Sequence, residues 1–253
     1  MNDHDAPRGQ PIEAVLFDVD GTLYHARRMR LRAIRSLLLR LPLRGIGRAR
    51  TALRILRAYR RALEDVRHEP PNSHPLAERH IERAAELAGV DGAEVRALTD
   101  EWLLRRALAW LLPCKRRGLD AVLTTLRRTG CRIGFFSDYP VAAKLTALRI
   151  DAADTLQLSA TDAEINAFKP WPHGFRHAAE AWSLRPDQIL YVGDRVDVDA
   201  TGAAAAGMRC AIFVDTRSAS PETDTDYWRV RDFPELLRRI QPLLVGPVRS
   251  ARP

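Results

Sequence analysis

Phe17-Asp18-Val19-Asp20-Gly21-Thr22-Leu23 places two aspartates one residue apart at the end of an apolar stretch. Residues 12–17 are predicted to form a short buried strand, after which Gly21 lets the backbone turn sharply. Charged side chains at this position are costly unless they bind a metal or take part in a reaction. The carboxyl ends of strands in an open α/β sheet are also where ligands bind. Asp18 is therefore a candidate nucleophile and metal ligand, and Asp20 a candidate general acid and base. Capping of the turn by both aspartates is the alternative.

A second group of carboxylates follows a second predicted strand, residues 189–194. This strand ends at Asp194, and Asp197 and Asp199 come shortly after it, before a helix of small residues predicted at 200–208. Mg²⁺ prefers oxygen ligands and usually keeps some waters and a substrate phosphate. Together with the first pair of aspartates, these residues predict a magnesium site. Asp194 would bind the ion directly, and either Asp199 or Asp197 would bind it directly or through water. Taken alone, the cluster could instead stabilise the N-terminus of the helix.

Ser137 and Lys169 lie between these two clusters. Ser137 follows a third predicted strand, residues 131–136, and its hydroxyl can hold a phosphoryl oxygen, although Ser-Asp is also common in turns. Lys169 precedes a proline and is one of only three lysines in a chain with 37 arginines. A compact ammonium suits a place beside a phosphate and a carboxylate nucleophile. An exposed loop lysine is the alternative for this position.

The ordered set of D-x-D-G-T, apolar-Ser, Lys-Pro and G-D-x-x-x-x-D resembles the four motifs of the haloacid dehalogenase-like hydrolase superfamily. The resemblance is to its phosphatases with a helical cap inserted between the first two motifs, of the phosphoglycolate phosphatase-like kind. It implies an α/β fold, in which a Rossmann-like parallel sheet core with helices on both faces carries an all-α cap domain. The implied core comprises residues 10–24 and 112–245, the cap domain residues 25–111, and flexible tails residues 1–9 and 246–253.

The resemblance also implies roles for individual residues. Asp18 would be the nucleophile that forms an aspartyl-phosphate, and Asp20 would protonate the leaving group and activate water. Ser137 and Lys169 would bind the phosphoryl group, and Lys169 would also steady the nucleophile. The implied Mg²⁺ ligands are Asp18, the backbone carbonyl of Asp20 and Asp194, with Asp199 in support. Members that cleave carbon–halogen bonds generally lack the second aspartate of the first motif, so Asp20 favours phosphoryl transfer.

Helical periodicity, with no convincing strand, fills the segment between the first two motifs. Helices are predicted there at 27–41, 48–66, 74–88 and 91–111. The second of these is expected to bury a face that comprises Leu53, Leu56, Leu63 and Val66. The shorter interval between Ser137 and Lys169 holds one predicted helix and one predicted strand, at 141–148 and 155–158, and leaves no room for a second cap. The core is predicted to close with a strand at 209–214, a polar loop at 218–226 and a helix at 233–244.

Charge is distributed unevenly along the chain. Asp138 stands where many relatives carry asparagine and adds a negative charge near the site. From Gly21 through Leu63 there is no Asp or Glu, while thirteen arginines lie between Arg27 and Arg61. Three interpretations stay open for these arginines: solvated helix faces in an arginine-rich composition, attraction of a strongly anionic substrate, or a surface for nucleic acid or anionic lipid.

The composition suits a folded enzyme of the reducing cytoplasm. A chain of 253 residues with 46% hydrophobic content can bury a substantial core and carry an insertion. Residues 1–11 are polar and predict no signal peptide, and no apolar segment reaches a membrane-spanning length. Cys114, Cys131 and Cys210 lack metal-ligand spacing and are expected to be buried, unreactive thiols.

The sequence thus predicts a Mg²⁺-dependent hydrolase that dephosphorylates a small phosphorylated metabolite through an aspartyl-phosphate. A phosphomutase is the alternative within the superfamily; it would use Asp18 and Asp20 in the same way, but it would need an activating bisphosphate and release no net phosphate. The alternative from another class is a protein that binds polyanions or membranes through the arginine-rich cap. The intact catalytic set argues against that alternative.

Overall fold

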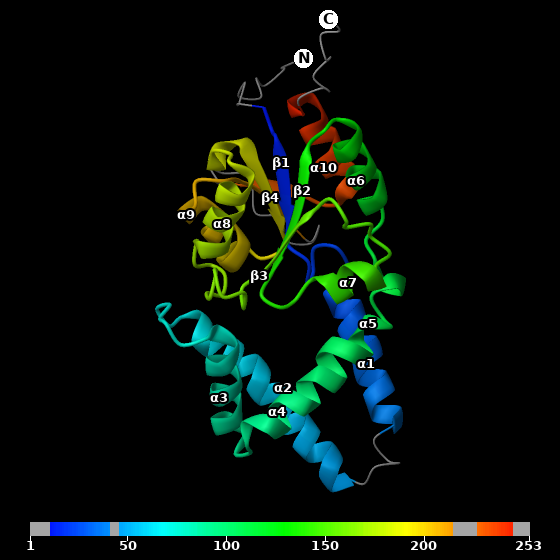
Figure 1. Ribbon diagram of the computed structural model, residues 1–253. Helices are drawn as coiled ribbons and strands as arrows, with labels where there is room; N and C mark the ends of the chain where they lie inside the picture. The colour runs from blue at the N-terminus through cyan, green and yellow to red at the C-terminus, as the bar shows by residue number, and fades with distance from the viewer. Residues whose placement is uncertain (1–10, 41–45, 215–226, 245–253) are drawn as a thin grey trace, which may run out of the picture.

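The computed structural model describes residues 11–40, 46–214 and 227–244. A parallel sheet lies at the centre of the part that holds both termini (Figure 1). It has six strands in the order β3-β2-β1-β4-β5-β6. The strands are β1 (Ala14–Phe17), β2 (Arg132–Ser137), β3 (Leu156–Ser159), β4 (Ile189–Gly193), β5 (Arg209–Phe213) and β6 (Trp228–Val230). Phe17 of β1 lies level with Phe135 of β2 and Val192 of β4, so the residues after these strands meet at one edge of the sheet.

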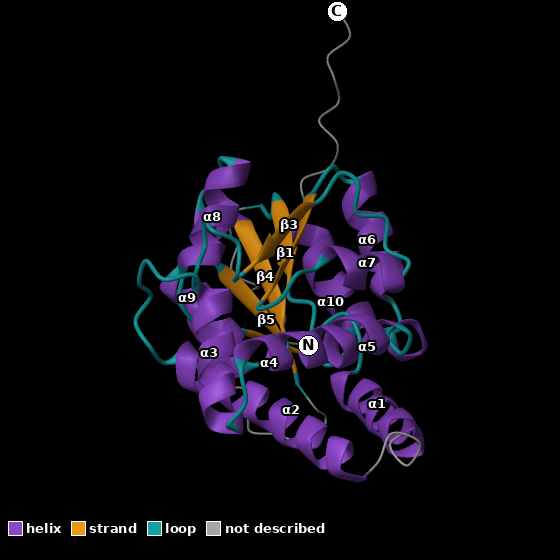
Figure 2. Cartoon of the chain, turned by 60° about the horizontal axis from the view of Figure 1, so that its bottom comes forward, coloured by secondary structure: helices purple, strands orange, loops and turns teal. Residues whose placement is uncertain are grey.

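Helices cover both faces of the sheet (Figure 2). One face packs against α6 (Leu119–Arg128), α7 (Ala142–Ala147) and α10 (Phe233–Ile240), and the other against α8 (His173–Trp182) and α9 (Thr201–Ala205). Side chains alternate along β1, with Val15 and Phe17 in the first core and Ala14 and Leu16 in the second. Because β1 is buried on both faces, it appears in the sequence as a continuous apolar stretch rather than an alternating one.

The remaining helices lie together at the carboxyl ends of the strands (Figure 1). They are α1 (Ala26–Arg40), α2 (Ile46–Arg67), α3 (Leu76–Ala88), α4 (Gly92–Thr99) and α5 (Arg106–Leu108). Helices α2, α3 and α4 share a small apolar core of their own, which is separate from the two cores beside the sheet. The predicted fold class, a Rossmann-like parallel sheet with added helices, is therefore confirmed, while the domain boundaries stay a prediction.

The buried face of α2 differs from the predicted one. The expected face contains Leu53, Leu56 and Leu63, but these three are only partly buried. Among the described side chains of the helix before its last turn, the buried ones are Ala52, Ile55, Ala58 and Ala62. Alanine is short, so this face lets α2 approach α3 closely, and dense packing outweighs the burial of larger side chains. The periodicity in the sequence was therefore correct for a helix, and Val66 at its end is buried as expected, but Leu53 and Leu56 do not form the buried face.

Smaller differences concern the ends and interruptions of elements. The predicted helix at 91–111 is interrupted by a π-helical segment, η2 (Asp100–Arg105), and strand β6 was not predicted. The other short helical turns are η3 (Leu112–Cys114), η4 (Pro186–Gln188), η5 (Val196–Ala200) and η6 (Gln241–Leu243). The predicted polar loop at 218–226 and the predicted tails lie outside the described residues. Among the described helices, none is long and apolar enough to cross a membrane.

Candidate active site

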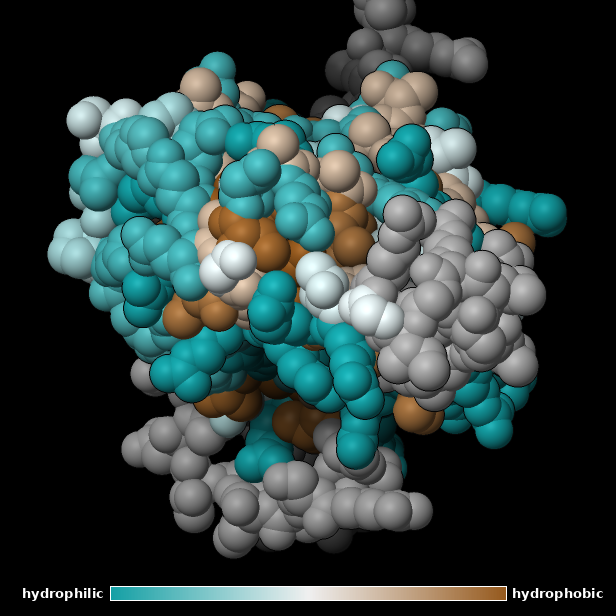
Figure 3. Space-filling model, turned by 90° about the horizontal axis from the view of Figure 1, so that it is seen from below, coloured by the Kyte–Doolittle hydropathy of each residue, from teal (hydrophilic) through white to brown (hydrophobic). Residues whose placement is uncertain are grey.

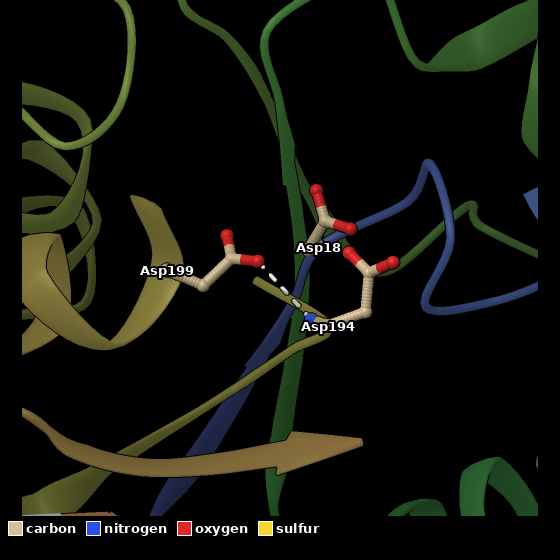
Figure 4. Close-up of side chains that lie close together, drawn as sticks. All are labelled: Asp18, Asp194 and Asp199. Atoms are coloured by element: carbon tan, nitrogen blue, oxygen red, sulfur yellow. Dashed lines mark hydrogen bonds between the residues drawn. The ribbon is translucent and has the colours of Figure 1, made fainter. Parts of the chain in front are cut away.

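Three aspartates meet where the order of the strands changes direction. β1 is flanked by β2 on one side and β4 on the other, which makes this point of the sheet the switch point at which open α/β folds bind ligands. Asp18 follows β1, and its backbone N–H donates to the carbonyl of Val192 at 2.8 Å. Asp194 follows β4, and Asp199 lies in the π-helical turn η5. The carboxylates of the three aspartates lie close together (Figure 4).

This cluster has the properties of a site for a hard cation. One oxygen of each of Asp18, Asp194 and Asp199 lies within 4.8 Å of the others. Asp18 Oδ2 is buried and has no hydrogen-bond partner in the described part of the chain. Burial and the neighbouring Asp199 raise the pKa of Asp194 to about 6, and burial with its acidic neighbours also raises the pKa of Asp18. A divalent cation relieves such repulsion, and the all-oxygen donor set fits Mg²⁺.

Two glycines make this arrangement sterically feasible. Gly21 has a φ of +109°, and a Cβ added there would lie 2.0 Å from Asp194 Oδ2. A Cβ added at Gly193 would lie 2.5 Å from the Cβ of Asp199. Each glycine therefore leaves the space that an aspartate of the cluster occupies, which gives both the D-x-D-G and the G-D motifs a physical reason.

Lys169 places a positive charge beside the three aspartates, at the carboxyl ends of the strands, which form the floor of the site. Its Nζ donates to Asp18 Oδ1 at 2.6 Å, to Asp199 Oδ1 at 2.8 Å and to Tyr191 Oη at 3.0 Å. Although burial opposes it, the two carboxylates raise the pKa of the Lys169 ammonium, so it stays protonated. Asp199 also accepts backbone N–H groups from Asp194 and Arg195 at 3.1 and 3.0 Å. Lys169 and Asp199 thus hold the Asp18 carboxylate in place.

Asp20 faces a different set of partners. Its Oδ1 accepts the Tyr24 hydroxyl at 2.5 Å, and its Oδ2 accepts Lys144 Nζ at 2.5 Å and Ser137 Oγ at 3.1 Å. Burial raises the pKa of Asp20, but Lys144 and these hydrogen bonds outweigh it and leave the pKa lowered. The Asp20 carboxylate is not part of the three-aspartate cluster. Its side chain is therefore held by Tyr24, Lys144 and Ser137 and lies outside the cluster.

Lys144, Tyr24 and Tyr191 are site residues that sequence reasoning missed. Lys144 is the third residue of α7 and is buried. The sequence predicted a short helix here but no site residue on it. Its rarity was a usable signal, because two of the three lysines in the chain, Lys144 and Lys169, contact the motif aspartates. Tyr24 and Tyr191 carried no such signal, since a tyrosine inside or beside an apolar strand is also a common core residue.

Of the two downstream candidates for metal support, only Asp199 joins the cluster. Asp197 turns outward, is 68% exposed and pairs with Arg195 at 2.6 Å. The π-helical turn η5 accounts for the difference, since it places Asp199 inside against Gly193 and Asp197 on the surface. The alternative in which Asp197 supports the metal is therefore not supported by the geometry.

The Asp138 carboxylate forms an ion pair with an arginine of α2. Arg67, at the end of α2 and 3% exposed, donates to Asp138 Oδ2 at 2.9 Å and also to the backbone carbonyl of Lys169. Asp138 Oδ1 in turn accepts the Lys169 backbone N–H at 3.3 Å. The loops that carry Ser137 and Lys169 are thus tied to each other and to α2. The additional negative charge expected at this position is paired rather than free.

A cavity of about 220 Å³ separates this floor from the helices above it. Asp18, Asp20, Ser137 and Lys169 line its floor together with their neighbours in the loops that follow the strands, and α1, α2 and the segment from Thr99 to Leu111 line the opposite side. This volume is below the roughly 300–1,000 Å³ of pockets for drug-sized ligands. Seen from the end of the molecule that these helices cover, the surface is largely hydrophilic, with hydrophobic side chains visible between the hydrophilic ones (Figure 3). The cavity therefore has the size to bind a small molecule.

The family model described as haloacid dehalogenase-like hydrolase matches residues 12–207. The chain therefore belongs to the haloacid dehalogenase-like hydrolase family, as its four motifs predicted.

Several curated relatives are phosphatases. The glyceraldehyde 3-phosphate phosphatase of Methanopyrus kandleri is 31% identical over 204 residues, which cover 78% of this chain and 82% of that protein. The phosphoserine phosphatase of Thermus thermophilus is 31% identical over 165 residues, which cover 64% of each protein. A phosphoglycolate phosphatase of Cereibacter sphaeroides is 33% identical over 132 residues, or 49% of this chain and 57% of that protein. These names agree with the sequence-based prediction of a phosphatase.

Solved structures share the fold over nearly the whole chain. A 2-haloacid dehalogenase from Pseudomonas syringae aligns with a TM-score of 0.61 at 22% identity, covering 90% of this chain and 99% of that one. A phosphatase of the same family from Thermococcus onnurineus aligns with a TM-score of 0.61 at 21% identity, covering 90% and 98%. Dehalogenases and phosphatases therefore share this fold, and the chemistry depends on the site.

Proposed function

We propose that the protein is a Mg²⁺-dependent phosphatase that removes the phosphoryl group from a small phosphorylated metabolite through an aspartyl-phosphate on Asp18. One observation carries this proposal: Asp18 Oδ2 is buried and has no hydrogen-bond partner among the described residues, while Asp18 Oδ1 is held by Lys169. A carboxylate fixed in this way has one oxygen anchored and the other available for attack or coordination. The names of the curated relatives support phosphate esters as the substrates.

Each residue on the floor would have its own role in the two steps of the reaction. In the first step, an Asp18 oxygen attacks phosphorus, the bond from phosphorus to the ester oxygen breaks, and the leaving oxygen takes a proton from Asp20. Asp20 would have to enter this step protonated, although Lys144 lowers its pKa in the free protein. In the second step, Asp20 takes a proton from water, whose oxygen attacks phosphorus and releases inorganic phosphate and the free Asp18 carboxylate. Ser137 and Lys169 would bind the phosphoryl oxygens during both steps.

The three-aspartate cluster would hold the metal ion in this scheme. Asp18 and Asp194 would bind Mg²⁺ with the backbone carbonyl of Asp20, and Asp199 would support the site. When bound, the ion would reduce the repulsion between the anionic phosphoryl group and the carboxylates. Lys169 alone cannot do so, because it already pairs with both Asp18 and Asp199.

The test follows the phosphorylated Asp18 formed in the first step and the inorganic phosphate released in the second. Purified protein is mixed with phosphate monoesters and Mg²⁺, inorganic phosphate is measured, and samples quenched in acid are digested and analysed by mass spectrometry. We expect net phosphate release and one transient phosphoryl group on the peptide that contains Asp18. Asp18→Asn, which keeps the size of the side chain, should show neither, with turnover lower by at least ~10³-fold.

Two results would contradict the proposal. Retention of a tenth of the wild-type activity in Asp18→Asn would exclude Asp18 as the nucleophile. A labelled Asp18 with no net phosphate release, and with activity only in the presence of a bisphosphate, would indicate the phosphomutase alternative instead.

A further inference from the structure

Lys144 is a buried cation to which the proposed reaction assigns no role. It lies on α7, is 7% exposed and belongs to none of the four motifs. A charged side chain is costly to bury unless it is paired and hydrogen-bonded. Lys144 Nζ donates to Asp20 Oδ2 at 2.5 Å and lies 3.5 Å from Ser137 Oγ, and all three residues line the cavity. Lys144 is therefore buried against the aspartate for which we propose proton transfer.

The two buried lysines of the site contact different aspartates. Lys169 Nζ pairs with Asp18 at 2.6 Å and with Asp199 at 2.8 Å. Lys144 Nζ pairs with Asp20. Because each lysine is engaged by carboxylates of its own, removal of Lys144 leaves the contacts of Lys169 in place and changes the surroundings of Asp20 alone.

The Asp20 carboxylate is held at both of its oxygens. Tyr24 Oη donates to Oδ1 at 2.5 Å, while Lys144 and Ser137 donate to Oδ2. The terminal torsion of an aspartate has no sharp minima of its own, so its hydrogen bonds decide the plane of the carboxylate. Without Lys144, Asp20 would keep only the two hydroxyl groups as donors from these three residues.

Lys144 also contacts the turn that carries Ser137. Its Nζ lies 5.6 Å from the centroid of the Tyr139 ring, and the Tyr139 backbone N–H donates to Ser137 Oγ at 3.3 Å. An ammonium group carries several donors on one compact nitrogen, so it can serve two acceptors at once. Asp20 after β1 and Ser137 at the end of β2 are thus aligned through one side chain.

We propose that Lys144 is a positioning residue, which holds the Asp20 carboxylate in the orientation that proton transfer requires, beside the serine that binds the phosphoryl group. This inference rests on the proposed phosphatase function and adds to it a residue from outside the four motifs. Both proposed steps depend on this orientation, because Asp20 gives a proton to the leaving oxygen and later takes one from water.

Lys144→Met tests this role, because methionine is also unbranched but lacks the ammonium group. With a phosphate monoester as substrate, kcat should fall by roughly 10–100-fold, while KM and Mg²⁺ affinity should stay within about twofold, since a misplaced catalytic group slows the reaction without weakening binding. Lys115→Met is the matched control, whose kcat should stay within about twofold. Lys115 also pairs with an aspartate, Asp120 at 2.6 Å, but it does not line the cavity.

A double-mutant cycle separates positioning of Asp20 from direct binding of the substrate. In the Asp20→Asn background, Lys144→Met should lower kcat by no more than about twofold, because residues that act as a unit do not have additive effects. Thermal unfolding shows whether each variant is folded, and Lys144→Gln, which keeps a hydrogen-bond donor, takes the place of Lys144→Met if that variant does not fold. An equal loss of kcat in both backgrounds, or a loss that lies in KM, would show that Lys144 acts on the substrate itself and would overturn the inference.

Crystal structures of the variants provide a readout that needs no turnover. In Lys144→Met the Asp20 carboxylate should turn away from its orientation beside Tyr24 and Ser137, whereas in Lys115→Met it should keep that orientation. A turned carboxylate supports the positioning contact even if the wild type releases no phosphate, in which case the proposed function alone fails. An unchanged carboxylate, or wild-type kcat in a folded Lys144→Met protein, would overturn the inference and leave the proposed phosphatase function intact.

Discussion

On the floor of the cavity the charged side chains are buried and paired, whereas most arginines of the helices above it are exposed. Lys169 Nζ lies 2.6 Å from Asp18 Oδ1, and both side chains are at most 5% exposed. Arg54 and Arg57 of α2 are exposed and do not line the cavity. Charges interact strongly where water is excluded, and weakly where solvent and salt screen them. Removing one charge is therefore expected to change stability and activity much more on the floor of the cavity than on the exposed helix faces.

This difference ranks the effects of substitutions. A change on the floor alters a network in which one lysine pairs with two carboxylates, so turnover, metal affinity and pH dependence should all respond. A change on the exposed face of α2 removes a charge that is individually worth little. The contact between α2, α3 and the sheet loops lies between these extremes, because it is buried but distant from the reacting atoms.

Asp20→Asn is expected to have the largest effect that changes turnover without changing metal affinity. Turnover should fall by roughly 10²–10⁴-fold, since both proposed steps need proton transfer by this side chain. Mg²⁺ affinity should stay nearly unchanged, because the Asp20 carboxylate contacts Tyr24, Lys144 and Ser137 rather than the three-aspartate cluster. Phosphate release and calorimetric titration with Mg²⁺ measure the two quantities. A collapse of Mg²⁺ affinity would show that the side chain itself is a ligand.

His80 should make the contact between helices and sheet sensitive to acid. It is 2% exposed, lies among Tyr59, Tyr139 and Phe168, and burial lowers its pKa from 6.5 to about 4. A base with a lowered folded pKa stabilises the fold above the unfolded pKa, and this stabilisation is lost as the pH falls from 6.5 to 4. The loss should reach about 3 kcal/mol.

Urea unfolding at pH 7 and pH 4.5 tests the His80 effect, with His80→Gln as the comparison. The wild type should lose more free energy of unfolding than the variant, because glutamine does not titrate. Equal losses in the two proteins would mean that the pKa of His80 is not lowered and that other groups account for acid sensitivity.

When no metal is present, Asp194 should make the folded protein less stable as the pH rises, which is the opposite of the effect expected for His80. Its pKa is raised from 3.8 to about 6, so the folded protein binds the extra proton, and stability is lost as the pH rises between these values. In the presence of a chelator, Asp194→Asn should therefore be more stable than the wild type at pH 7, by about 2 kcal/mol after allowance for partial solvent screening. The difference should vanish near pH 4.

Added Mg²⁺ supplies the control for this prediction. The ion should raise the melting temperature of the wild type and not that of Asp194→Asn, because binding to the folded state alone stabilises it. An equal rise in both proteins would remove Asp194 from the metal site.

The floor could be predicted from the sequence because its residues follow buried strands. Asp18, Ser137 and Asp194 each come directly after an apolar stretch, and a parallel sheet brings such positions to one edge. The same logic does not extend to the partners of these residues. Lys144 lies on a helix whose rotation the sequence does not specify, and its contact with Asp20 depends on how α7 packs against the sheet.

The helices above the floor were harder to predict in detail. Their existence followed from periodicity, but the inward face of α2 proved to be the one with Ala52, Ile55 and Ala58. Which arginine is paired, buried or exposed depends on that rotation. Arg67 belongs to the same arginine-rich chain as Arg57, yet it is buried and pairs with Asp138. Residue type alone therefore could not decide between the three interpretations of the arginines.

The smallest effect is expected where the charge is most exposed. Arg54→Gln/Arg57→Gln should change kcat/KM by less than about twofold at physiological salt, because these arginines face solvent and the Debye length there is about 8 Å. Their number would matter only if they acted together through a long-range field. In that case kcat/KM would fall tenfold or more at low salt and recover as salt is added, and the interpretation as solvated helix faces would be wrong. Unchanged kinetics with lost retention on heparin or anionic vesicles would instead indicate a polyanion surface. Retention and kinetics that both stay within twofold of the wild type would leave these arginines as solvated side chains and confine the functional charge of α2 to the residues that face the cavity.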